Sequence, residues 1–204
     1  MHPAVTFGAA LAALAVATAA CARSDGETSA KRATNEAPSA IAGTVIHVTD
    51  GDTLVMRERG GASFVVRLTD IDAPETSHGA NRPGQPFSSK ATTHLKDLAL
   101  GLAADAECYG RDVRQGNDGT ERVRHICRVR AAGKDLSLAM VDVGLAMANR
   151  QNKRYVRDKT VYAHEDQAKR QEVGLWAQPE PIAPWVWRRM CWQHKFCEAA
   201  DRAP

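Results

Sequence analysis

The chain has 204 residues, which is enough for one domain with a hydrophobic core plus short extensions. Its hydrophobic fraction of 44% and charged fraction of 25% are those of an ordinary globular protein, and they exclude the biased compositions of fibrous and disordered chains. The formal net charge of +3 is compatible with a polyanionic partner, but it does not distinguish such a protein from other soluble proteins.

Residues 1–22 contain no Asp, Glu, Lys or Arg, and most of them are small or apolar. This run is short for a membrane span and ends in an Ala20-Cys21-Ala22 cleavage pattern, so we predict a secretory signal peptide and a periplasmic or secreted protein. Lipid attachment at Cys21 is an alternative, although Thr18 stands where a lipoprotein signal prefers a large aliphatic residue. Residues 23–40 are polar, and we predict a disordered linker there.

The folded part is predicted to begin at Ile41 with three strands. Their segments are rich in β-branched residues and are separated by turn residues: 44–48, 53–56 and 64–68. A helix is predicted next and is expected to run through about Leu102, because apolar residues recur at three- and four-residue steps at Ala91, Leu95, Leu98 and Leu102. Its apolar stripe should lie on the sheet.

Two further strands, 106–113 and 122–130, flank a turn-rich segment and predict a hairpin. A short helix is predicted between Asp135, which can cap it, and Gly144, which can end it. A third helix is predicted over about 156–173. Five strands with three α-helices indicate an α+β fold built on a five-stranded OB-type barrel.

Two short acidic segments lie beside the predicted strands, at 50–53 and 70–75. Calcium takes oxygen ligands, and we expect Asp52 and Asp72 to supply carboxylates and Ala73 a backbone carbonyl. Two protein carboxylates leave most of the coordination shell to water and substrate phosphate, as metal-assisted hydrolysis requires.

The same segments contain two further charged residues. Glu75 is left as the general base for an attacking water, and Arg67 is suited to hold phosphate oxygens and to stabilise charge in the transition state. The alternative is that all these charges are surface turn residues in ion pairs. The complete set of residue types favours a catalytic site.

Four cysteines remain after the predicted signal peptide, and they allow three disulfide pairings. We favour Cys108 with Cys127, across the hairpin, and Cys191 with Cys197, within a tail over residues 179–204. A metal site of Cys191, His194 and Cys197 is the alternative, but a closed zinc site needs a fourth ligand. Tryptophans in the tail are expected to pack on the domain, and stacking on single-stranded bases is the alternative.

Four motifs occur in an order typical of one family: Gly51-Asp52-Thr53, then Arg67 followed by Asp72-Ala73-Pro74-Glu75, then Gly144-Leu145-Ala146, then Gly174-Leu175-Trp176. On these motifs, residues 41–178 resemble the staphylococcal nuclease, or thermonuclease, family. The resemblance implies an OB barrel with three helices and Ca²⁺-dependent hydrolysis of DNA and RNA to products with a 3′-phosphate. It also implies that Glu75 is the general base.

The family's second catalytic arginine follows an Asp-x-Tyr-Gly motif that is missing here. Counting back from Gly133-Lys134 assigns that position to Arg124, with Arg122 a minor candidate. Arg111 follows a Tyr109-Gly110 pair, but it belongs to the preceding predicted strand. We therefore favour Arg124 over Arg111.

A basic stretch after residue 149 contains Lys153, Arg154 and Tyr155. Contact with nucleic acid through phosphates and base stacking is one interpretation, and a solvated helix entry is the other. For the whole chain, a monomeric nuclease is the main hypothesis. A non-catalytic OB module that binds nucleic acid or protein is the alternative.

Overall fold

The computed structural model describes residues 1, 39–115, 119–151 and 155–197. The chain divides into two compact units, Met1–Ala33 and Thr34–Pro204, and all described residues except Met1 belong to the second. The predicted signal peptide except Met1, all but the last two residues of the predicted linker, and Lys153 and Arg154 therefore lie outside the described residues.

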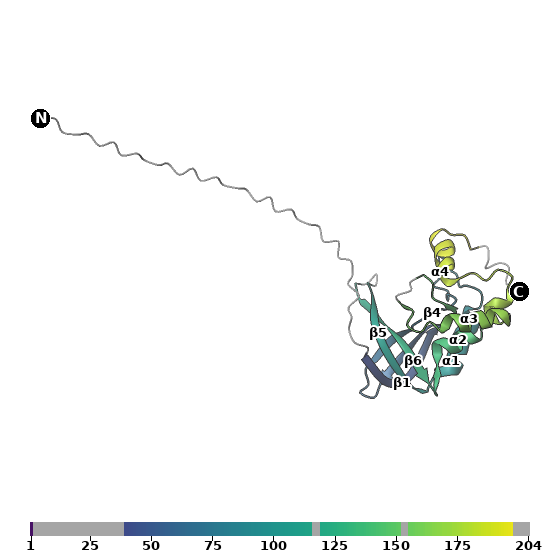
Figure 1. Ribbon diagram of the computed structural model, residues 1–204, viewed down its shortest axis with the longest axis horizontal. Helices are drawn as coiled ribbons and strands as arrows, with labels where there is room; N and C mark the ends of the chain where they lie inside the picture. The colour runs from purple at the N-terminus through teal and green to yellow at the C-terminus, as the bar shows by residue number, and fades with distance from the viewer. Residues whose placement is uncertain (2–38, 116–118, 152–154, 198–204) are drawn as a thin grey trace. The chain divides into compact units, whose positions relative to one another are not determined.

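Five strands form a closed barrel (Figure 1). β1 (Ser39–Asp50) pairs antiparallel with β2 (Thr53–Glu58) and β5 (Ala103–Gln115), and β2 pairs antiparallel with β3 (Ser63–Leu68). β5 pairs antiparallel with β6 (Glu121–Ala131), and a parallel pairing of β3 with β6 closes the ring. The predicted five-stranded OB-type barrel is confirmed, and each strand is longer than predicted. β1 begins two residues before the predicted start at Ile41.

Successive side chains of each strand point alternately into the barrel and toward its outer face. On β3, Val66 and Leu68 are buried inside the barrel. Arg67, which lies between them, therefore projects from the outer face. The helix α1 (Ser88–Ala99) packs its buried Ala91 and Leu95 against the barrel, as its apolar spacing predicted.

The predicted end of this first helix is wrong by three residues. α1 ends at Ala99, and Leu100 and Leu102 are exposed beyond it. Gly101 adopts a positive φ of 79°, and its N–H donates to the carbonyl of Val45 at 2.8 Å. A left-handed glycine bonded to β1 ends the helix here, although the leucine spacing continues.

The helices α2 (Leu136–Asp142) and α3 (Val161–Arg170) pack against each other beside the barrel (Figure 1). Asp135 accepts hydrogen bonds from the N–H groups of Ser137 and Leu138, so it caps α2 as predicted. α3 is shorter than predicted. Three two-residue strands complete this region: β4 (Ile71–Asp72) pairs with β8 (Met147–Ala148), and β7 (Lys134–Asp135) pairs with β6.

The motifs that begin at Gly144 and Gly174 contact each other through their backbones. Gly144 has a φ of 67°, and a side chain there would collide with the carbonyl of Val173. Gly174 opens the 3₁₀ turn η2 (Gly174–Ala177), and a Cβ at this position would lie 2.5 Å from the carbonyl oxygen of Gly144. Close backbone approach therefore requires glycine at both positions.

A C-terminal segment, defined as residues 179–197, folds back onto the domain. It contains α4 (Pro184–Trp187) and the π-helical turn η3 (Arg188–Gln193), neither of which was predicted from the sequence. Trp187 is buried, and the indole N–H groups of Trp187 and Trp192 both donate to the carbonyl of Pro83, at 3.3 and 2.9 Å. The structure contains both predicted disulfides, Cys108–Cys127 and Cys191–Cys197.

Candidate active site

The turn between β1 and β2 fixes Asp52. The carboxylate of Asp50 accepts the N–H of Asp52 at 3.0 Å, and the carbonyl of Asp52 accepts the N–H of Leu68 at 2.8 Å. The strand register places Thr53 opposite Arg67. Asp52 therefore lies in the turn directly before β2, within reach of Arg67 on the neighbouring strand β3.

Arg67 joins the two predicted metal ligands. Its Nη1 donates to Asp52 Oδ1 at 3.0 Å, and its Nη2 lies 3.0 Å from Asp52 Oδ2 and 2.7 Å from Asp72 Oδ1. Burial alone would lower the pKa of Arg67, but the two carboxylates outweigh it and raise the pKa above the usual value. The guanidinium stays charged.

Asp52 is almost completely buried and is fully hydrogen-bonded. Besides Arg67, it accepts the hydroxyl of Thr53 and the N–H of Ala73, each at 3.0 Å. Burial raises the pKa of Asp52, although Arg67 opposes that shift. Burial thus disfavours the ionised form of this carboxylate, and the positive charge of Arg67 favours it.

The donor set fits a hard divalent cation, because Asp52, Asp72 and the carbonyl of Ala73 all offer oxygen. One oxygen of each carboxylate lies within 3.0 Å of the same nitrogen, Arg67 Nη2, so a positive charge already bridges them. In the described part of the chain, no group of three or more His, Cys, Asp or Glu side chains is arranged to hold a metal ion. A cation here would depend on two carboxylates, backbone, water and substrate.

Glu75 lies beside this pair, at the end of the second acidic segment. Its backbone is held by Gln85, which accepts the N–H of Glu75 through Oε1 at 3.3 Å and donates its own N–H to the carbonyl of Glu75 at 2.8 Å. The side chain of Glu75 is mostly buried, and this burial raises its pKa although Arg188 opposes the shift. A carboxylate of raised pKa is suited to accept a proton.

Arg188 is a site residue that the sequence did not reveal. It comes from η3 and lies on the carboxylates, with Nη2 2.7 Å from Asp72 Oδ2 and Nη1 3.1 Å from Asp72 Oδ1. Its Nη1 also donates to Glu75 Oε1. The tail of the sequence interleaves arginines with tryptophans, but no local pattern indicated Asp72 and Glu75 as partners of Arg188.

Arg124 lies on the same face as Arg67. The register pairs it with Val65, two residues before Arg67 on β3, so both arginines project from the outer face of the sheet. Its Nη2 donates to Asp112 at 2.7 Å. Its Nε is buried without a hydrogen-bond acceptor among the described residues. No contact joins Arg124 to Asp52, Asp72 or Glu75 in this structure.

Arg111 has a different orientation. It pairs with His125, the neighbour of Arg124, so its side chain starts from the opposite face of the hairpin. Arg122 lies on the face of Arg124 and stands directly opposite Arg114 on β5. The structure thus brings Arg124 and Arg122, but not Arg111, to the face that carries Arg67.

Tyr155 lies beside the second acidic segment. Its carbonyl accepts the hydroxyl of Thr69 at 2.7 Å and the N–H of Asp70 at 3.2 Å, while its side chain is exposed. Asp70 has a positive φ of 71°, and its carboxylate accepts the N–H groups of Arg157 and Asp158. These bonds fix the chain near Tyr155 next to the candidate site.

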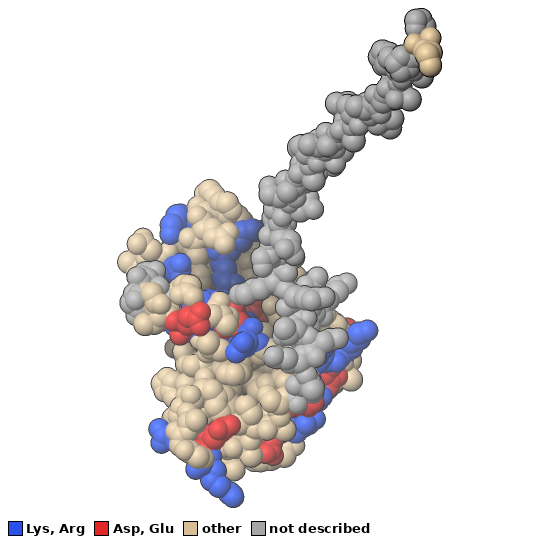
Figure 2. Space-filling model, turned by 90° about the vertical axis from the view of Figure 1, so that its left-hand side faces the viewer, with Lys and Arg blue, Asp and Glu red and all other residues tan. Residues whose placement is uncertain are grey.

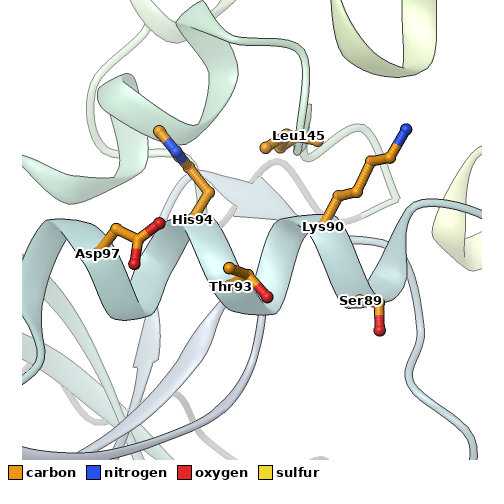
Figure 3. Close-up of a pocket in the computed structure, with 6 residues that line it drawn as sticks. All are labelled: Ser89, Lys90, Thr93, His94, Asp97 and Leu145. Carbon is orange, nitrogen blue, oxygen red and sulfur yellow. The ribbon is translucent and has the colours of Figure 1, made fainter.

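A surface cavity of about 380 Å³ lies elsewhere, over α1 (Figure 3). Lys90 and His94 project from the helix on either side of Leu145, and Ser89, Thr93 and Asp97 complete the lining. The ammonium of Lys90 stands 4.7 Å from the ring centre of Phe87. None of the predicted site residues lines this cavity.

Within the described ranges, none of the helices has the length and apolarity needed to cross a membrane.

Comparisons with known proteins agree with the geometry. The family model described as staphylococcal nuclease homologue matches residues 65–178. Similar proteins include an uncharacterized endonuclease of Haemophilus influenzae, 34% identical over 158 residues that cover 77% of this chain and 76% of the relative. Another is a micrococcal nuclease of Shigella flexneri, 33% identical over 161 residues that cover 72% of this chain and 80% of the relative. On the extent of these matches, the chain belongs to the family of staphylococcal nuclease homologues.

Proposed function

We propose that this protein is a Ca²⁺-dependent nuclease that hydrolyses phosphodiester bonds in DNA and RNA. The family and the names of its relatives support a hydrolytic nuclease. The observation that carries the proposal is the cluster in which Arg67 bridges Asp52 and Asp72 while Arg188 joins Asp72 to Glu75. A module that only binds nucleic acid has no chemical need for three buried or half-buried carboxylates at one point.

The ligands proposed for Ca²⁺ are the carboxylates of Asp52 and Asp72 and the carbonyl of Ala73. When bound, the cation would polarise the scissile phosphate and hold the attacking water. The side chains of Asp52 and Asp72 are nearly inaccessible to solvent, which keeps their oxygens in fixed positions. With two protein carboxylates, we expect weak cation binding in the absence of substrate.

Glu75 is proposed as the general base. It would take a proton from the water while the water oxygen attacks phosphorus and the P–O5′ bond breaks; the leaving 5′-oxygen takes up a proton from bulk water, which gives products with a 3′-phosphate and a 5′-hydroxyl. The raised pKa of Glu75 supports this role, because its carboxylate binds a proton more strongly than an exposed one. The hydrogen bonds of its backbone to Gln85 hold it next to the metal ligands.

Arg67 and Arg124 are proposed to bind phosphate oxygens and to stabilise negative charge in the transition state. Arg67 is ionised and fixed beside the proposed cation ligands. Arg124 is supported by its position on the same face and by its buried Nε, which a phosphate oxygen could satisfy. Its present partner Asp112 would have to share or release it.

Contacts to the rest of the substrate are proposed for Tyr155, Lys153 and Arg154. The exposed ring of Tyr155, held beside Asp70, supports base stacking. Export as a monomer is also proposed. Two disulfides support an oxidising compartment, since such bonds persist outside the cytosol.

The test is an analysis of reaction products. Single-stranded DNA and RNA of defined sequence are incubated with the purified protein in millimolar Ca²⁺ or Mg²⁺, and the ends of the fragments are identified by mass spectrometry. We expect fragments with a 3′-phosphate and a 5′-hydroxyl that form with Ca²⁺. Fragments with a 5′-phosphate, or equal rates without divalent cation, would overturn the assigned chemistry.

A further inference from the structure

The C-terminal segment holds Arg188 rigidly over the carboxylates. The buried Trp187 precedes Arg188, and the Cys191–Cys197 disulfide follows it. The side chain of Gln85, whose backbone bonds to Glu75, donates to the carbonyl of Ile182 at 2.6 Å. On the face shown in Figure 2, several basic side chains lie on the upper tan part with acidic side chains below them, and further basic side chains lie at the lower end. The neighbours of Arg188 on both sides are therefore anchored, so we expect any rearrangement at the site to involve the side chain of Arg188.

The guanidinium of Arg188 donates hydrogen bonds to the carboxylate lone pairs that a cation would need as ligands. It binds both oxygens of Asp72, and Arg67 binds one of them as well. A carboxylate oxygen has two acceptor sites, so Asp72 retains little capacity for another ligand. A fixed positive charge at this distance also repels a divalent cation.

Asp72 does not depend on Arg188 for its position. It lies in β4, its backbone pairs with Met147, and Arg67 Nη2 holds its carboxylate at 2.7 Å. The charge balance also indicates that a divalent cation can replace Arg188 at this site. Three carboxylates, on Asp52, Asp72 and Glu75, face two guanidiniums. Without Arg188, two negative charges are left uncompensated, which matches a divalent cation.

We propose that Arg188 is a third arginine of the active site, which binds Asp72 and Glu75 in the cation-free protein, yields Asp72 to the cation, and then binds substrate phosphate. Its side chain is about one quarter exposed, and its Nη2 already reaches Gln151 Oε1 at 3.3 Å, so the guanidinium borders on solvent. A planar guanidinium binds phosphate with two parallel hydrogen bonds. The inference rests on the nuclease function proposed above.

The first test measures cation affinity without nucleic acid. Calorimetric titration with Ca²⁺ is carried out on the wild type, on Arg188→Gln and on Arg189→Gln. Arg189 is the exposed neighbour and provides the same change of charge. We expect Arg188→Gln to bind Ca²⁺ at least about tenfold more tightly than the wild type, and Arg189→Gln to bind within about twofold. Equal or weaker binding by Arg188→Gln would overturn the proposal.

If thermal unfolding shows that Arg188→Gln does not fold, the same Ca²⁺ titration is carried out on Arg188→Lys. Lysine keeps the charge but cannot bind both oxygens of Asp72 in a planar fork. We expect a smaller gain in Ca²⁺ affinity in the same direction. An unchanged affinity of this variant would count against competition for Asp72.

The second test measures substrate binding at saturating Ca²⁺. For a short single-stranded oligonucleotide, we expect Arg188→Gln to raise KM at least about fivefold, because a charged hydrogen-bonded contact to phosphate is lost. Arg189→Gln should leave KM within about twofold. An unchanged KM for Arg188→Gln would overturn the phosphate-binding half of the proposal.

The two proposals fail in different ways. If the wild type cuts DNA with Ca²⁺ but Arg188→Gln shows no gain in Ca²⁺ affinity, the nuclease function stands and the role proposed for Arg188 is wrong. If Arg188→Gln binds Ca²⁺ more tightly but the wild type cuts neither DNA nor RNA, Arg188 and the cation do compete for Asp72, and the proposed nuclease function is wrong.

Discussion

Arg67 shows how a single side chain organises the candidate site. Its two terminal nitrogens bind both proposed cation ligands, and the alternation of β3 directs it away from the core. The sequence could predict Asp52, Arg67, Asp72 and Glu75, because they lie within 24 residues of each other beside strong strand patterns. It could not predict Arg188, whose partners Asp72 and Glu75 are 116 and 113 residues away.

The second catalytic arginine is the residue assignment most open to test. We expect Arg124→Ala to lower kcat about 10²- to 10³-fold, because a phosphate contact that stabilises the transition state is lost. Arg111→Ala, which removes an exposed arginine of the opposite face, should keep kcat within about twofold. Initial rates on single-stranded DNA measure both. A full rate in Arg124→Ala together with an inactive Arg111→Ala would reverse the assignment.

The short elements around the site depend on charged groups as well as on apolar packing. α3 buries Glu165, which binds Arg150, Lys169 at 2.8 Å and the N–H of Ala148 at 2.9 Å. Burial alone would raise the pKa of Glu165, but these three partners outweigh it and lower the pKa below its usual value of 4.5. Because the pKa is lowered on folding, ionised Glu165 stabilises the fold above about pH 4.5, and this contribution is lost as the pH falls.

Glu165→Gln should therefore lower the free energy of unfolding by about 1–3 kcal/mol at pH 7, with a smaller loss at pH 3. Urea unfolding at both pH values measures the difference. Asp166→Asn is the matched control on the same helix, since Asp166 is exposed and its separation from Lys169 is 3.8 Å. It should cost less than about 0.5 kcal/mol. An equal loss for Glu165→Gln at both pH values would contradict the assigned charge state.

The β5–β6 hairpin places two arginines directly opposite each other, Arg114 and Arg122. Like charges in such a pair repel each other, although the carboxylate of Asp112 lies 3.2 Å from Arg114 and offsets part of this repulsion. Both lie on the face of Arg124, where a nucleic-acid phosphate would offset the repulsion.

Arg122→Gln should accordingly raise the free energy of unfolding by about 0.2–1 kcal/mol. It should also weaken the binding of long single-stranded DNA and reduce the slope of log affinity against log salt by about one unit. Denaturant unfolding and fluorescence anisotropy at several salt concentrations provide the two readouts. Unchanged salt dependence would exclude Arg122 from the substrate path.

Within the unit Thr34–Pro204, the C-terminal segment brings Arg188 to Asp72 and Glu75 beside the barrel. Hydrophobic alternation and helical spacing were sufficient to predict the barrel, its five strands and its first three helices. The end of α1 was wrong because the prediction followed the leucine spacing to Leu102, whereas Gly101, a residue type that ends helices, stops the helix and donates its N–H to the carbonyl of Val45 on β1. α4 was missed because its four residues are too few for a periodic pattern, and its position depends on contacts to Pro83 and Gln85.

The two disulfides should contribute unequally to the stability of the whole fold. Cys108–Cys127 closes a loop of 19 residues with both side chains buried in the core, whereas Cys191–Cys197 closes only 6 residues in the C-terminal segment. We expect the free energy of unfolding to fall by about 3 kcal/mol when the first pair is changed to Ala, and by about 2 kcal/mol for the second. Urea unfolding measures both. The opposite order would show that the barrel does not depend on its hairpin link.

The reaction proposed for the carboxylate cluster is cleavage of nucleic acid with the help of Ca²⁺. It is tested by following binding and cleavage of single-stranded DNA together, for the wild type and for Glu75→Gln, in millimolar Ca²⁺ and in chelator. We predict that the wild type cuts only with Ca²⁺, and that Glu75→Gln binds the DNA but cuts it at least about 100-fold more slowly. A wild-type protein that binds DNA and RNA in Ca²⁺ and leaves both intact would contradict the account and identify a binding module.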